Sequence, residues 1–432
     1  MKKARMFLLA LLSLCALCLG LGSCKKSSIG ADGLKYTLTE DGEGYVVSAV
    51  DAVTVADLVI PATYKEKPVL EIKGFAFEEQ EGITSVTVPA SVKVIGAHAF
   101  YGCGSLETIH FAENSALASI GSYAFAECHG LSALTIPASL EEMGRGAFQR
   151  CSSLQTVTFE EEGRLEVVGD YAFFECRGLE NVTFATEGVL TYIDENAFLG
   201  CESLTSVTIP ASVEEIGRHA FYKCTALEEI RFEEESGLTA IWDEAFAYCE
   251  SLSSLTLPNR KVDLYRGAFS YCKGLTDVTV PHENSYLYHA VFRGCESLET
   301  LTLPFVGAGK WASWSGALLG YHFGTYKMND LGVYDMEENL NDYVPDSLKT
   351  VVITCDTHVS RRAFTQCHSI TEIHLPSSIT WIGGDAFREC ESLVAIHFGG
   401  TMEEWNAIGK ENFWNSKTGE YTVYCADGNL TK

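Results

Sequence analysis

The chain has 432 residues, of which 47% are hydrophobic and 21% charged, and its formal net charge is −27. This apolar fraction, with 38 Gly and only 10 Pro, excludes an intrinsically disordered chain. Because a strongly acidic surface repels phosphate groups, the charge argues against nucleic-acid binding and against docking on anionic membranes through a basic patch.

Residues 1–23 are predicted to form a signal peptide. Three basic residues precede the apolar run 7–21, which is shorter than the roughly 20 residues that a helix needs to cross a bilayer. The stretch "LGSC" at 21–24 resembles the lipobox of bacterial lipoproteins, and this implies that Cys24 is lipidated and becomes the first mature residue. Plain cleavage at a small residue is the alternative. Residues 24–33 would form a lipidated tether, and losing three positive charges would change the net charge to −30.

A phenylalanine recurs along most of the chain at intervals of 23 or 25 residues. It usually follows an Ala and precedes a Cys by three positions, and we call it the marker of each repeat. Each interval contains an alternating apolar run such as 204–209, a Pro or an acidic turn, a second short run such as 213–217, and the Phe turn. Alternation and β-branched residues predict a strand in both runs. The markers are Phe77, Phe100, Phe125, Phe148, Phe173, Phe198, Phe221, Phe246, Phe269, Phe292, Phe364 and Phe387.

The regular spacing predicts a repeat solenoid, mainly β with short helical turns and built from 23- and 25-residue units. One unit cannot bury its own apolar face, so stacked units share a core whose rows are about 4.8 Å apart. The Cys of each unit should lie on an inward row, where its weak S–H donor covers a backbone carbonyl. Disulfides between neighbouring rows are the alternative, but side chains of one row point the same way and a disulfide needs converging Cβ atoms.

The unit "LxxIxLPxSVxxIGxxAFxxC" resembles the BspA-like leucine-rich repeat family of bacterial surface proteins over about residues 34–425. The resemblance implies an N-terminal capping unit at 34–82, repeats at 83–304 and 348–398, and a C-terminal capping unit at 399–432. It also implies an exported protein that binds host matrix, host cells or other bacteria.

Residues 305–347 break the repeat and are rich in Gly and aromatic side chains. Exposed aromatic residues anchor interfaces, so the predicted contact patch comprises Trp311, Trp314, Tyr321, Phe323 and Tyr326. Two alternatives remain open: these rings pack against the side of the solenoid, or the segment forms two degenerate coils. The acids between Asp330 and Asp346 could bind calcium, although their spacing does not match an EF-hand.

The exposed column of the first strand carries mostly Thr, which β-sheet packing explains better than ice binding. Near its end the column carries His374 and His397, with Glu372 beside them. Two stacked imidazoles could hold a metal ion, but surface histidines without a third ordered ligand are the favoured interpretation, and no metal site is predicted.

Enzyme signatures fail on their details. "GAGK" at 307–310 lacks the first glycine and the Ser or Thr of a P-loop. His282 and His289 in "HENSYLYH" are seven residues apart, which is too far for one zinc ion on a helix. A carboxylate pair for glycoside hydrolysis, which geometry defines and spacing does not, stays open among the acids.

The sequence therefore predicts an exported leucine-rich repeat protein, lipid-anchored to the bacterial cell envelope at the outer membrane or cell surface. It would bind a protein or glycan on a host or bacterial surface, without catalysis and without a cofactor. The alternatives are a structural envelope protein without a dedicated ligand and an enzyme whose site lies in 305–347.

Overall fold

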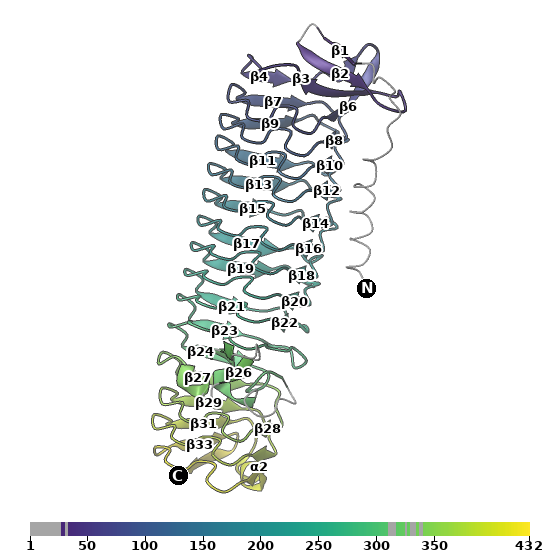
Figure 1. Cartoon of the computed structure of the whole chain (residues 1–432). Helices are drawn as coiled ribbons and strands as arrows, with labels where there is room; N and C mark the ends of the chain where they lie inside the picture. The colour runs from purple at the N-terminus through teal and green to yellow at the C-terminus, as the bar shows by residue number, and fades with distance from the viewer. Residues whose placement is uncertain (1–26, 31–32, 310–316, 325, 329–333, 337–339) are drawn as a thin grey trace.

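The computed structural model shows an elongated stack of coils in which two columns of short strands run along the length of the molecule (Figure 1). The N-terminal strands lie at one end of the stack and the C-terminal strands at the other. The structure describes residues 27–30, 33–309, 317–324, 326–328, 334–336 and 340–432. The predicted repeat solenoid is confirmed.

The first column holds the longer strand of each coil, and its strands pair in parallel within three successive sheets, β4–β9, β11–β19 and β21–β33. Inward and outward positions alternate, so Val207 is buried while Thr208 is exposed. The bounds are β4 (Asp57–Val59), β7 (Ser85–Val88), β9 (Thr108–Phe111), β11 (Ala133–Ile136), β13 (Thr156–Phe159), β15 (Asn181–Thr183), β17 (Ser206–Ile209), β19 (Glu229–Phe232), β21 (Ser254–Thr256), β23 (Asp277–Thr279), β24 (Thr300–Leu303), β27 (Thr350–Ile353), β29 (Glu372–Leu375), β31 (Ala395–Phe398) and β33 (Thr422–Cys425).

The second column holds strands that are mostly two residues long and pair in parallel within three groups, β6–β12, β14–β22 and β28–β32. Usually only one of the two side chains in such a strand is buried, as with Ile216 of β18. The bounds are β6 (Lys67–Ile72), β8 (Val94–Ile95), β10 (Ser119–Ile120), β12 (Glu142–Met143), β14 (Val167–Val168), β16 (Tyr192–Ile193), β18 (Glu215–Ile216), β20 (Ala240–Ile241), β22 (Asp263–Leu264), β28 (His358–Val359), β30 (Trp381–Ile382) and β32 (Gly409–Lys410).

The Phe turn closes each coil with two residues in the left-handed region of backbone space. In the unit of Phe221 these are His219, with φ 55°, and Lys223, with φ 60°. The turn also bonds to the next coil, since the Phe198 N–H donates to the Ala220 carbonyl at 2.7 Å. Hydrogen bonds of this kind run along the stack, so each coil satisfies the backbone groups of its neighbour.

A glycine after the second strand allows neighbouring coils to approach closely. A Cβ on Gly144 would lie 2.4 Å from the Ser122 nitrogen, and one on Gly121 would lie 2.4 Å from the Ala97 nitrogen. A side chain at either of these two glycines would require the backbone of the neighbouring coil to shift. This explains the Gly of the "IGxxAF" part of the repeat.

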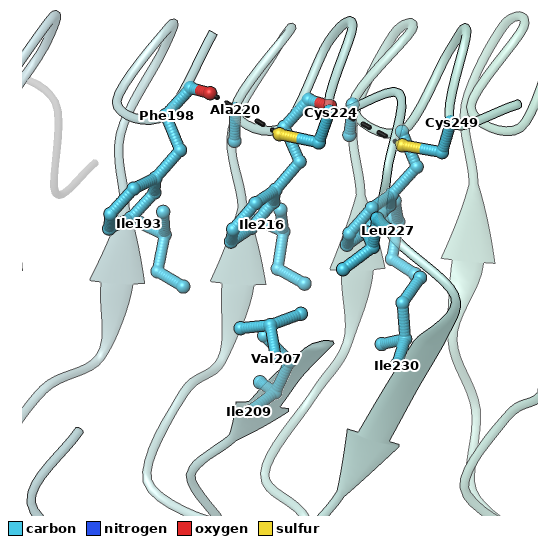
Figure 2. Packing of buried hydrophobic residues seen from close by; sticks show 14 of the residues in the cluster. Ile193, Phe198, Val207, Ile209, Ile216, Ala220, Cys224, Leu227, Ile230 and Cys249 are labelled. Carbon is cyan, nitrogen blue, oxygen red and sulfur yellow. Dashed lines mark hydrogen bonds between the residues drawn. The ribbon is translucent and has the colours of Figure 1, made fainter. Parts of the chain in front are cut away.

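The interior is a continuous stack of phenylalanine rings flanked by a row of thiols. Phe198 and Phe221 lie 5.1 Å apart between ring centroids with an interplanar angle of 6°. The Cys224 thiol donates to the Phe198 carbonyl at 3.4 Å, and Cys249 donates in the same way to Phe221 (Figure 2). The described cysteines are free, so the predicted thiol row and its bond to a backbone carbonyl are confirmed.

Both ends of the stack are covered by antiparallel strands. At the N-terminal end β1 (Ser27–Ile29), β2 (Leu34–Leu38) and β3 (Tyr45–Ala49) form an antiparallel meander. β3 pairs with β6, and β5 (Thr63–Tyr64) forms an antiparallel hairpin with the start of β6. At the C-terminal end β33 turns back into β34 (Gly428–Thr431).

The helix α2 (Met402–Ala407) completes the C-terminal end. Thr401 and Glu404 form a reciprocal capping box at its start, which satisfies two backbone donors of a very short helix. Trp405 of this helix is buried, and its ring packs against Phe398 of the last full coil. The end of the apolar core is thereby shielded from water.

The segment 305–347 interrupts only part of the architecture, because β24 pairs directly with β27. Its first half instead completes the coil that β24 begins. The Phe292 N–H donates to the His322 carbonyl at 2.9 Å, so His322 and Phe323 occupy the positions that Ala and Phe hold in a regular unit. The described residues form one coil between the turns of Phe292 and Phe364, and the alternative of two degenerate coils is wrong.

Two single-turn 3-10 helices hold the interrupted part together. They are η2 (Leu319–His322) and η3 (Leu340–Tyr343). The Oδ1 atom of the buried Asn341 accepts from the Gly320 N–H at 2.7 Å, and its Nδ2 atom donates to the Thr365 carbonyl at 2.8 Å. Asn341 thus replaces inter-coil backbone hydrogen bonds.

Candidate functional site

The predicted contact patch is only partly described by the structure. Trp311 and Trp314 lie outside the described residues. Tyr326 begins β25 (Tyr326–Met328), which pairs antiparallel with β26 (Tyr334–Met336), and its side chain is outside the described part as well. The calcium prediction for the acids between 330 and 346 likewise falls largely on residues that the structure leaves out.

Tyr321 and Phe323 correct the prediction of an exposed patch. Their side chains are 8% and 2% exposed. Phe323 faces Phe292 at 6.5 Å between ring centroids, and Tyr321 lies edge-on to the half-buried His289 at 6.4 Å. Phe323 packs in the main core and Tyr321 in a small cluster with Ala308 and Leu318, so neither ring is exposed as a contact for a partner.

An exposed aromatic column, absent from the sequence-based prediction, lies beside the second strands. The rings of Trp242 and Tyr265 stack 4.1 Å apart, and those of Tyr265 and Tyr288 stack 4.5 Å apart. Tyr286 meets Tyr288 edge-on at 4.7 Å. Tyr286 and Tyr288 are 42% and 37% exposed, while Trp242 and Tyr265 are half-buried. We call these four residues the aromatic column.

Carboxylates accompany the aromatic column. The Trp242 indole N–H donates to Glu215 at 2.9 Å, and the Tyr286 backbone N–H donates to Asp263 at 2.9 Å. Burial, together with neighbouring hydroxyl and carboxylate groups, raises the pKa of Tyr265 to about 12. The surface therefore offers ring edges, phenolic hydroxyls and fixed acids, which are the groups that contact polar ligands and protein side chains.

A signal for the aromatic column was present in the repeat itself. Trp242, Tyr265 and Tyr288 each occupy the place that Gly121 or Gly144 holds after the second strand of regular units. Aligning successive units would have placed the three rings in one row. The sequence-based prediction instead placed the contact patch in the interrupting segment 305–347.

Near the C-terminal end of the first column, two histidines and a glutamate lie together on the exposed face of the sheet. His374 of β29 pairs with His397 of β31 in register, and their rings stack 4.3 Å apart with an interplanar angle of 11°. One carboxylate oxygen of Glu372 lies 3.8 Å from Nε2 of each histidine. Burial and the nearby His397 lower the pKa of His374, so its imidazole is neutral near pH 7. The structure thus brings a carboxylate close to both imidazoles, whereas the sequence favoured surface histidines without a third ordered ligand.

The two histidines of "HENSYLYH" do not lie on a helix. His282 lies in an irregular segment and His289 in a turn, with the isolated bridge of Leu287 between them. Burial and the charge of Arg266 lower the pKa of His289 to about 4. Lys310, the last residue of "GAGK", lies outside the described residues.

The family model for the BspA type leucine rich repeat region matches residues 70–191, 191–307 and 347–426. These ranges cover well over half of the chain. The chain belongs to the BspA-type leucine-rich repeat family. The sequence-based resemblance is therefore confirmed.

Solved structures of other bacterial leucine-rich repeat proteins are similar to this BspA-type chain. One from Bacteroides ovatus has a TM-score of 0.57 and 22% identity, covering 91% of this chain and 99% of its own. A leucine rich cell surface protein from Faecalibacterium prausnitzii has a TM-score of 0.45 and 25% identity, covering 90% and 98%. Among curated proteins no sequence matches significantly. Within the described residues, no helix has the length and apolar character needed to span a membrane.

Proposed function

We propose that this BspA-type protein binds a protein or glycan on a host or bacterial surface and that it acts without catalysis. It is exported by its signal peptide and held at the cell envelope, at the outer membrane or cell surface, by a lipid on Cys24. Family membership supports a binding role. The observation that carries the proposal is the aromatic column, since partly exposed tyrosines and tryptophans anchor interfaces at low entropic cost.

The acidic character of the chain indicates which surface charge a partner would carry. The net charge of −27 favours partners that present basic or neutral surfaces, and Glu215 and Asp263 place fixed carboxylates beside the rings. Trp311, Trp314 and Tyr326 remain proposed contacts. A structural envelope protein without a dedicated ligand is the second candidate, supported by the long regular stack, and an enzyme centred on 305–347 is the third.

The experiment measures binding of the full chain to host matrix proteins, glycans and whole bacterial cells. One variant carries Tyr286→Ser and Tyr288→Ser, which removes the two most exposed rings of the aromatic column. The matched control is Phe413→Asn, because Phe413 is 74% exposed at the far end of the molecule and Asn tolerates its φ of 62°. A third variant lacks residues 325–339 and keeps η2 and η3, whose contact through Asn341 holds the ends together.

We expect the double Tyr variant to bind at least about tenfold more weakly while the Phe413 variant binds normally. Loss of binding only in the 325–339 deletion would move the site to that segment and contradict the role of the aromatic column. Failure of the unaltered chain to bind any member of the panel would favour the structural candidate. Mass spectrometry of the bound ligand tests catalysis, because an enzyme would return a changed ligand.

A further inference from the structure

We propose that Glu372, His374 and His397 form a surface site for a divalent transition-metal ion of the zinc type. The ligands are the two Nε2 atoms and one carboxylate oxygen. This inference is independent of the aromatic column, which lies in another part of the stack.

Three ligand atoms of these side chains converge. One donor atom from each residue can be chosen so that all three lie within 4.8 Å of one another. The Glu372 oxygen is 3.8 Å from Nε2 of His374 and 3.8 Å from Nε2 of His397. In a tetrahedral site with metal–ligand distances near 2.0–2.1 Å, ligand atoms are roughly 3.4 Å apart, so small side-chain movements complete the geometry.

The repeat architecture fixes the positions from which the ligands project. Glu372 and His374 are two residues apart on β29 and therefore point from the same face of the sheet. His397 pairs with His374 across neighbouring parallel strands. Ala395 pairs with Glu372, and its small side chain leaves the carboxylate free to reach His397.

The outer side of the pair is closed by Tyr424 of β33. Its ring stacks on that of His397 at 5.0 Å with an interplanar angle of 13°. This contact limits the rotation of the His397 ring away from His374. Because the two imidazoles are nearly parallel, metal binding requires each ring to tilt toward the other, and their side chains, 36% and 37% exposed, have the freedom to do so.

The donor set selects the chemical class of the ion. Two imidazoles and a carboxylate suit Zn²⁺, Cu²⁺, Ni²⁺ or Co²⁺, whereas Ca²⁺ and Mg²⁺ require mainly oxygen ligands. Three protein ligands on an exposed sheet leave a coordination position open to water or to a donor atom of a partner.

The test titrates the full chain, without a histidine tag, with Zn²⁺ in a calorimeter and with Co²⁺ in a spectrophotometer. The background carries Cys355→Ser and Cys425→Ser, since these two thiols are partly exposed. The test variants are Glu372→Gln, His374→Gln and His397→Gln. The control is His110→Gln, because His110 occupies an exposed position on β9 of the same column and pairs with Thr87 in place of a second histidine.

We expect one Zn²⁺ per chain, about tenfold or greater weakening in each single test variant, and unchanged affinity in the His110 variant. Visible absorption of Co²⁺ should appear with the unaltered site and disappear in His374→Gln/His397→Gln. Unchanged circular dichroism would show that the variants fold. Absence of stoichiometric Zn²⁺ binding, or equal binding by the test and control variants, would overturn the proposal.

Discussion

Each cysteine of the repeat combines a packing role with a hydrogen-bonding role. The Cys103 thiol donates to the Phe77 carbonyl at 3.0 Å, and burial raises its pKa to about 11. Burial also raises the pKa of Cys295 to about 12. These thiols therefore stay protonated at neutral pH, which preserves the S–H donor and makes them poor nucleophiles.

Two histidines near the interruption should make the protein sensitive to acid. Burial lowers the pKa of His322 to about 4, and burial with the charge of Arg266 lowers that of His289 to about 4. In the unfolded chain these histidines have their ordinary pKa near 6.5, so they bind more protons there than in the folded chain between pH 6.5 and 4. The contribution of these histidines to the free energy of unfolding is therefore fully present above pH 6.5 and is lost as the pH drops toward 4. The loss is roughly 3 kcal/mol for the buried His322 and smaller for the half-buried His289, which solvent screens.

Chemical denaturation at a series of pH values between 7 and 4 measures this effect. His289→Gln/His322→Gln should lose stability less steeply with acid than the unaltered chain, because Gln does not titrate. The His110→Gln variant should keep the original pH dependence, since that side chain is exposed on β9. Parallel curves for all three proteins would contradict the assignment to the buried pair.

The residue types of the core could be predicted from the sequence because the repeat supplies many copies of one environment. Phe and Cys recur at one spacing, so their inward direction followed from stacking alone. Tyr321 and Phe323 have no such copies. Their burial depends on where the backbone of η2 crosses the end of the Phe292 coil, which a single aromatic-rich stretch does not reveal.

At the scale of elements, η2 and η3 show how the stack tolerates an interruption. The first-column sheet stays continuous through β24 and β27, while the opposite side is completed by Phe323 and Asn341. The sequence predicted where the regular pattern stops and resumes. It did not predict that one side of the coil persists, since the hydrogen bonds of Asn341 join residues far apart in sequence.

Asn341→Ala should destabilise the protein by about 3 kcal/mol, because it leaves the Gly320 N–H and the Thr365 carbonyl buried without their partner. Denaturant unfolding measures the loss, and hydrogen exchange at Gly320 should accelerate more than exchange in β9. Asn429→Ala is the matched control, since Asn429 is exposed in β34. Equal stability of the two variants would show that Asn341 does not join the coils.

At the scale of the whole molecule, stability depends on closing both ends of the stack. Removing residues 402–432 would expose the edge of β31 and the Phe398 ring, which the Trp405 ring now contacts. Open edges pair with other chains, so the truncated protein should form dimers and larger aggregates in light-scattering chromatography. Thr401→Ala, which breaks only the capping box, should lower stability by about 1 kcal/mol and leave the protein monomeric. A monomeric truncated chain would contradict the capping role.

The direction of the hydrogen bonds between coils has a mechanical consequence. The bond from the Phe198 N–H to the Ala220 carbonyl joins neighbouring coils, as does the bond from the Cys224 thiol to the Phe198 carbonyl drawn in Figure 2. Tension between the two ends therefore pulls on such bonds one coil at a time. Each 23-residue coil that detaches would add about 80 Å of extended chain. Under load, the protein would therefore lengthen in small steps at low force and would not rupture in a single event.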